Sequence, residues 1–234
     1  SGAYYMWRAR TVSTGEAVPR HGLARSMVEG LVYIYSHKTI AVFVILVAFH
    51  CILVMSYESI LPAISKDKLG AGSVGVSYLI AGVGGGALFT SIFLAGVRSE
   101  SVRGKLFLFF AFTSGLGPML LAWSDSSTVS IAATVIMGAN QAGFMTISHT
   151  IIQSLTEDHV RGRVAGVYSV HVGGSMAVTN MANAAFADIF SASSVLVFGG
   201  LIFVAVVFVS LGNGSLRTLY FPGAAKTAVG AAAD

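Results

Sequence analysis

The sequence predicts an all-α membrane protein with six transmembrane helices. The first observation is a series of six long apolar stretches, each close to the roughly 20 helical residues that cross a hydrocarbon core. They cover residues 39–57, 71–97, 106–123, 128–152, 164–187 and 193–212. The second observation is that 10% of the residues are charged and 55% are hydrophobic, whereas a soluble domain carries about 25% charge. Because a bilayer offers no water to backbone N–H and C=O groups, each stretch is expected to be a helix.

The third observation is the placement of the 14 Lys and Arg residues. Five lie before the first stretch, three in the second connection, two in the fourth and two after the last stretch. Lys66 and Lys68 fall on the opposite side. The positive-inside rule then predicts a multi-pass membrane protein with both termini in the cytoplasm. The net charge of +4 follows from this topology and indicates no nucleic-acid partner.

The sequence divides the chain into three regions. Residues 1–38 are expected to form a cytoplasmic connector, in which 25–35 mix apolar and charged residues as an amphipathic surface helix does. Residues 39–212 are the six-helix bundle, and 213–234 a disordered cytoplasmic tail. The chain begins Ser-Gly-Ala, and residues 3–7 resemble the end of a preceding span, so we expect a truncated N-terminus.

The polarity of the six stretches suggests an internal 3+3 repeat. The first, fourth and fifth stretches carry imidazoles, amides or a carboxylate, and the second is rich in glycine. The third and sixth are almost wholly apolar and are expected to face lipid. Two three-helix units would give this order, and repeated units of this kind are a known plan in transporters.

Polar side chains inside the stretches are costly in hydrocarbon and usually face a bundle interior or a wet cavity. The substrate-pathway candidates are His50, Tyr57, Glu58, Gln141, His171, Ser175, Thr179, Asn180 and Asn183. Interhelical hydrogen bonding is an equal alternative for the histidines and amides, and Ser and Thr can bond back to their own helix. Glu58 is either a proton-coupling group or a solvated residue at the external boundary.

Other residue patterns bear on packing and on chemistry. Gly82 and Gly86 form a GxxxG pattern, which lets two helix backbones approach closely. The lone Cys51 excludes an intramolecular disulfide, and no histidine pair has metal-ligand spacing on one helix. An intramembrane protease that uses Ser175 would need a histidine on a later helix, but all six histidines precede this serine. We therefore expect no enzyme, no metal and no cofactor.

Two predicted cytoplasmic loops carry recognisable motifs. Residues 161–168 read RGRVAGVY, and residues 96–105 read GVRSESVRGK. The first resembles the segment before the eleventh helix of major facilitator superfamily exporters, especially the branch of the enterobactin exporter and related drug-efflux proteins. The second is similar to the basic loop signature between helices eight and nine, although it lacks the usual Asp-Arg pair. Residues 25–35 resemble the amphipathic segment before helix seven.

This resemblance implies the C-terminal half of a twelve-helix transporter, with the six spans as helices seven to twelve. Such a protein exports a small molecule such as a drug or siderophore in exchange for protons, by rocking against its missing N-terminal six-helix half. The implied cytoplasmic gate and loop residues are Gly96, Arg98, Arg103, Gly104, Lys105, Arg161, Gly162 and Arg163. The rival hypothesis is a non-transporting six-helix membrane protein that serves as a partner or assembly subunit.

Overall fold

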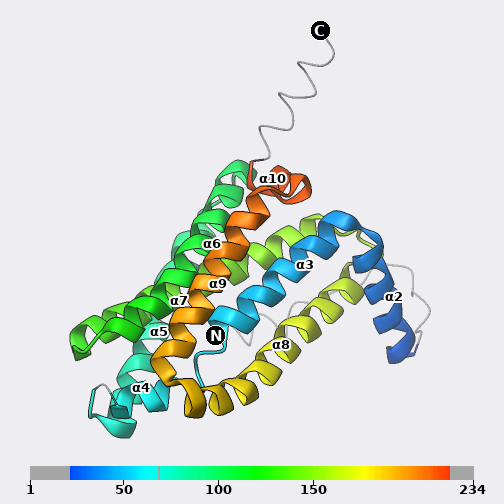
Figure 1. The fold of residues 1–234 in the computed structure, drawn as a ribbon. Coiled ribbons are helices and arrows are strands. Elements are labelled where there is room, and N and C mark those ends of the chain that lie inside the picture. The colour runs from blue at the N-terminus through cyan, green and yellow to red at the C-terminus, as the bar shows by residue number, and fades with distance from the viewer. Residues whose placement is uncertain (1–21, 68, 222–234) are drawn as a thin grey trace, which may run out of the picture.

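The described part of the chain is helical throughout. A computed structural model describes residues 22–67 and 69–221, which form helices and turns without a strand (Figure 1). The helices are α2 (Leu23–Ser36), α3 (Lys38–His50), the π-helix η1 (Cys51–Met55), α4 (Leu61–Asp67), α5 (Gly72–Ala95), α6 (Glu100–Trp123), α7 (Ser127–Ser154), α8 (Arg161–Phe190), α9 (Ala192–Leu211) and α10 (Gly214–Tyr220). Helix α2 covers the segment in which the sequence predicts an amphipathic helix. The predicted end of a preceding span at 3–7 lies outside the described residues.

Four described helical segments are both long and apolar enough to cross a membrane. They are the α3–η1 segment Lys38–Met55, α5, α6 and α9. Helices α7 and α8, with 28 and 30 residues, are longer still but carry more polar side chains. The prediction of six spans is therefore confirmed for four segments and stays a prediction for α7 and α8.

The first predicted span, 39–57, is not one continuous α-helix. Helix α3 ends at His50, one π-helical turn follows, and the chain then bends before α4 begins. The Ser56 hydroxyl donates a 2.8 Å hydrogen bond to the carbonyl of Cys51, which satisfies an acceptor at the end of the helix. Single π-turns inside helices are rare and are frequent at functional sites.

Glycines set the closest helix crossing, between α5 and α7. A Cβ atom at Gly82 would collide with the Thr134 side chain, and one at Gly86 with the carbonyl of Val135. From the other side, a Cβ atom at Gly138 would collide with the carbonyl of Val83. The GxxxG pattern of the sequence therefore lies on the face of α5 where the two backbones meet, which is the geometry that small residues permit.

Helix α6 differs from the lipid-facing wall that the sequence suggests. It packs against both α7 and α9, and half of its most apolar window is buried. Its contact with α9 is another glycine crossing, in which a Cβ atom at Gly115 would lie 2.8 Å from the carbonyl of Gly200. An apolar helix serves a protein core as well as it serves lipid, so apolarity alone did not distinguish the two environments.

The tail expected to be disordered from residue 213 begins with an ordered helix. Asn213 caps α10 by accepting hydrogen bonds from the N–H groups of Ser215 and Leu216. The Tyr220 side chain is buried, and its hydroxyl lies 2.8 Å from the Ser210 hydroxyl. Burial raises the pKa of Tyr220 to about 12, so its hydroxyl keeps its proton at neutral pH. The structure thus corrects the expectation for 214–220, while 222–234 lie outside the described residues.

Candidate functional site

His50 lies in the packed core at the end of α3. Its ring stacks on Phe144 of α7, with ring centroids 3.8 Å apart, and meets Phe203 of α9 edge-on at 5.0 Å. The side chain is fully buried, and neither ring nitrogen has a hydrogen-bond partner among the described residues. Aromatic packing therefore takes the place of the interhelical hydrogen bond that the sequence left open for this residue.

Tyr57 and Gln141 join the bend after η1 to α7. The Tyr57 hydroxyl donates a 2.7 Å hydrogen bond to Oε1 of Gln141. Both residues, together with His50 and Ser114, border a void of about 10 Å³. Three of the nine predicted pathway residues thus meet at one buried point.

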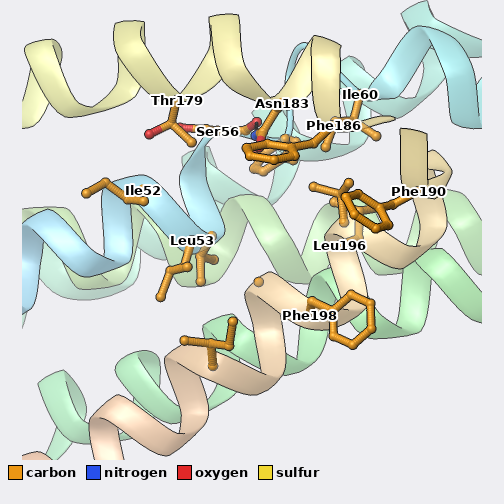
Figure 2. A pocket seen from close by; sticks show the side chains of 15 residues that line it. Ile52, Leu53, Ser56, Ile60, Thr179, Asn183, Phe186, Phe190, Leu196 and Phe198 are labelled. Atoms are coloured by element: carbon orange, nitrogen blue, oxygen red, sulfur yellow. Dashed lines mark hydrogen bonds between the residues drawn. The ribbon is translucent and has the colours of Figure 1, made fainter. Parts of the chain in front are cut away.

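A larger cavity of about 450 Å³ lies between η1, α8 and α9 (Figure 2). This volume is within the range of small-molecule sites. Thr179 and Asn183 border it from α8, and Tyr57 from the bend after η1. The Asn183 amide donates a 2.6 Å hydrogen bond to the carbonyl of Ser56, drawn as the dashed line in Figure 2. Two of the predicted pathway residues on α8 therefore reach a cavity wall.

Apart from Ser56, the rest of the cavity wall is apolar, and its residues were not among the predicted site residues. The rings of Phe186, Phe190 and Phe198 border the cavity (Figure 2). Phe186 and Phe190 are four residues apart on α8, a spacing that places them on one helix face and was an available signal. None of the 15 described residues that line the cavity is charged. An ion inside it would lose its hydration without gaining a counter-charge, so the wall suits an uncharged molecule.

His171 faces the connector helix α2 instead of the cavity. Its Nδ1 lies 3.0 Å from the carbonyl of Val167, and its Nε2 lies 3.0 Å from the Tyr35 hydroxyl. Since a carbonyl only accepts, Nδ1 donates to Val167, and Nε2 of the corresponding neutral tautomer accepts from the Tyr35 hydroxyl. Helix α2 also lies close to α8 at Gly30, where an added Cβ atom would lie 2.8 Å from the carbonyl of Arg163.

The basic residues at the start of α8 are held by carboxylates. Glu29 of α2 lies between Arg25, at 3.0 Å, and Arg163, at 2.9 Å. Arg161 pairs with Asp158 at 2.5 Å, and Gly162 next to it is exposed. The sequence did not single out Glu29 as a partner of this motif, although it is the acidic residue of the predicted amphipathic helix.

The second basic group lies at the α5–α6 connection. The Arg103 guanidinium donates two hydrogen bonds, of 3.2 and 3.1 Å, to the carbonyl of Val97. Gly96 ends α5, and Gly104 is packed against the carbonyls of Leu219 and Tyr220 in α10. Arg98 and Lys105 are exposed. The predicted gate residues thus form two groups, one against α2 and one against α10.

The remaining candidates do not join these clusters. Glu58 is exposed, and Ser175 is half-buried on α8. Oδ1 of Asn180 is buried without a hydrogen-bond partner among the described residues. Within that same part of the chain, no group of three or more His, Cys, Asp or Glu side chains could hold a metal ion.

Membrane-length helices, glycine crossings and a cavity between three helices are the architecture of a membrane transporter. The model of the transmembrane secretion effector family matches residues 3–218, and the chain belongs to this family of major facilitator superfamily transporters. It is therefore a multi-pass membrane protein of a transport family and not an enzyme. The comparisons with curated proteins and with solved structures found no match.

Proposed function

We propose that this chain is the C-terminal six-helix half of a proton-driven exporter of the inner membrane, with both termini in the cytoplasm. The observation that carries the proposal is the cavity of about 450 Å³ between η1, α8 and α9, in a chain of a transporter family. Residues 39–212 form the bundle of superfamily helices seven to twelve, arranged as a 3+3 repeat. Residues 1–38 are the cytoplasmic connector from the other half.

Alternating access gives the cavity its role. Substrate sites of such transporters lie between helices that move relative to one another, and two halves rock around the site. The division of the cavity wall among η1, α8 and α9 supports this role. The exposed side chains of Val178 and Met181 on α8 are then covered by the other half or by lipid. Ser175 and Asn180 lie on the same helix and line the path beyond the cavity.

The basic motifs serve the cytoplasmic gate. Arg163 and Arg161 are paired with Glu29 and Asp158, so the start of α8 is fastened to α2 and to its own loop. Rocking of α8 requires these contacts to be exchanged for others. The similarity of residues 161–168 to the enterobactin-exporter branch supports outward transport.

The lining of the cavity favours one of the two substrate classes. A catecholate siderophore carries negative charge when it holds iron, and the described cavity wall offers no cation to receive it. An uncharged, mainly apolar drug-like molecule loses little hydration there. We therefore place drug-like compounds ahead of siderophores.

Flux of three probes tests the proposal. Cells that lack their own exporters and express the full-length gene are loaded with Nile red (uncharged), ethidium (a permanent cation) or a ferric catecholate siderophore. We expect faster loss of Nile red than from cells with an empty vector, and collapse of this difference when an uncoupler is added. No uncoupler-sensitive flux of any probe contradicts the proposal and favours the rival role as an assembly subunit.

A further inference from the structure

The small void beside His50 has the size and the lining of a site for one water molecule. It lies between the end of α3, α6 and α7, and its volume is about 10 Å³. About 10–15 Å³ in this measure suffices for one water, provided that two to four polar groups surround it. Its lining residues are His50, Val54, Met55, Tyr57, Ser114, Pro118, Met137 and Gln141.

The four polar lining residues supply both donors and acceptors to such a water. The hydroxyls of Tyr57 and Ser114 already donate to Gln141 and to the carbonyl of Ala111, so their oxygens keep lone pairs that accept. The Gln141 amide nitrogen adds donors. The neutral His50 ring brings one N–H donor and one acceptor nitrogen.

His50 is hard to explain as a packing residue. Its ring contacts are Phe144 and Phe203, and a phenylalanine would make the same contacts. Buried polar groups nearly always have partners, yet both ring nitrogens of His50 lack one among the described residues. An imidazole here costs stability that a phenyl ring would not, which points to a use for its nitrogens.

We propose that His50 is the group that binds and releases the coupling proton, with water reaching it at this void. The inference rests on the proposed transport function. A hydronium ion on one side gives its proton to the free lone pair of the ring, an N–H bond forms, and the imidazolium later returns the proton to water on the other side. No other reactant is consumed.

The surroundings of His50 tie this proton to a conformational change. Tyr57 and Cys51 are the titratable neighbours on its own segment, while α6, α7 and α9 face it with Ser114, Gln141 and aromatic rings. In the closed core, an imidazolium at His50 would be a buried charge without a counter-charge. Proton binding therefore belongs to a state in which the void is open to water, and closure of the packed core expels the proton.

Reconstituted full-length transporter tests this assignment. The variants are His50→Phe, which matches the aromatic surroundings, and His50→Gln, with His149→Gln as a control at an exposed histidine of α7. We expect Nile red flux driven by a pH gradient to fall at least about fivefold in both His50 variants, the lower end of usual couplings between two sites. Exchange of Nile red across equal pH moves no net proton and should persist, and the control should match the wild type.

Gradient-driven flux that survives in both His50 variants overturns the assignment. If the wild-type protein moves no Nile red, the result counts against the proposed transport function and not against the role of His50. Proton binding to His50 is then measured directly. In ¹⁵N-histidine NMR, the signal that His50→Phe removes should change to the imidazolium pattern as the pH is lowered, because the assignment requires the ring to bind a proton. A signal that stays neutral at every pH at which the protein remains folded also overturns the assignment.

Discussion

The side-chain amide of Asn183 holds the carbonyl of Ser56 at 2.6 Å, across 127 positions of sequence. This bond joins α8 to the bend that follows the π-turn η1, at the wall of the large cavity. Ser56 is buried, and its carbonyl also accepts a longer hydrogen bond, of 3.4 Å, from the Ser59 hydroxyl, so Asn183 is its closer partner. A movement of α8 away from η1 would have to break this bond, so we expect Asn183 to be a sensitive position for stability and, under the proposed function, for transport.

Replacement of Asn183 by Leu tests that dependence. The variant keeps a similar volume but leaves the Ser56 carbonyl with only the 3.4 Å hydrogen bond from Ser59, and the loss of one hydrogen bond costs about 0.5–1.5 kcal/mol. We expect a lower thermal unfolding temperature in detergent and a reduced Nile red flux. Met181→Leu on the exposed side of the same helix is the matched control, and it should change neither measurement. Equal behaviour of the two variants would show that the bond has no such role.

The glycines of α5 offer a comparison within one helical turn. Gly86→Ala places a methyl group against the carbonyl of Val135, whereas Gly84→Ala meets no atom within 4 Å. We expect Gly86→Ala to destabilise the protein by about 1–3 kcal/mol through overpacking. Gly84→Ala should be neutral or stabilising by about 0.5–1 kcal/mol, since alanine favours a helix over glycine. Thermal unfolding of both variants in one detergent gives the answer, and a stable Gly86→Ala protein would contradict the crossing.

The ion pair between Glu29 and Arg163 is expected to act on transport more than on stability. Partly exposed pairs of this kind contribute about 0–1 kcal/mol, so Glu29→Gln should unfold within a few degrees of the wild type. Its flux should change, because the start of α8 is released from α2. The exchange Glu29→Arg with Arg163→Glu restores opposite charges and should recover flux that either single reversal loses.

Arg25→Gln is the control for that experiment, because Arg25 pairs with the same carboxylate but is largely exposed. We expect its flux to stay near the wild-type value. If neither single charge reversal changes the flux and the double exchange does not change it either, the pair has no gating role.

The packing of helix α10 against the core gives a fourth prediction. Tyr220 is buried and stacks on Phe107 of α6 at a centroid distance of 5.9 Å. Tyr220→Ala should cost about 3–5 kcal/mol, as for other large aromatic side chains removed from a core. Thr218→Ala, at an exposed position of the same helix, should be silent in the same thermal unfolding assay. Matching unfolding temperatures would show that α10 is not part of the folded core.

Much of the architecture follows from hydropathy, because span length and apolarity are properties of each segment by itself. The Gly82–Gly86 pattern also predicted a close crossing from one helix alone. The π-turn at 51–55 was not predicted, since its residues are as apolar as those of the α-helix before it. The ordered helix α10 was missed because a seven-residue amphipathic segment has little signal beside an Ala- and Gly-rich tail.

The residue types of the candidate site could be predicted from the sequence, but which of these residues lie together could not. Polar residues inside apolar stretches singled out His50, Gln141, Thr179 and Asn183, and the structure places each of them at a void or a cavity wall between helices. Which of them meet depends on how the helices pack, and long-range pairs such as Tyr57 with Gln141 leave no local pattern. His171 shows the same limit, because its partner Tyr35 lies on a connector helix whose position the sequence does not fix.

The π-turn η1 has one further consequence. A helix advances by about 100° per residue, so the extra residue of a π-turn rotates all that follows relative to what precedes it. His50, before the turn, faces the one-water void between α6 and α7, while Ser56, after it, faces the cavity beside α8 and α9. A single-residue deletion within 51–55 would return the segment to α-helical register. It would turn Ser56 by about 100° relative to His50, and so away from the cavity wall that it now forms.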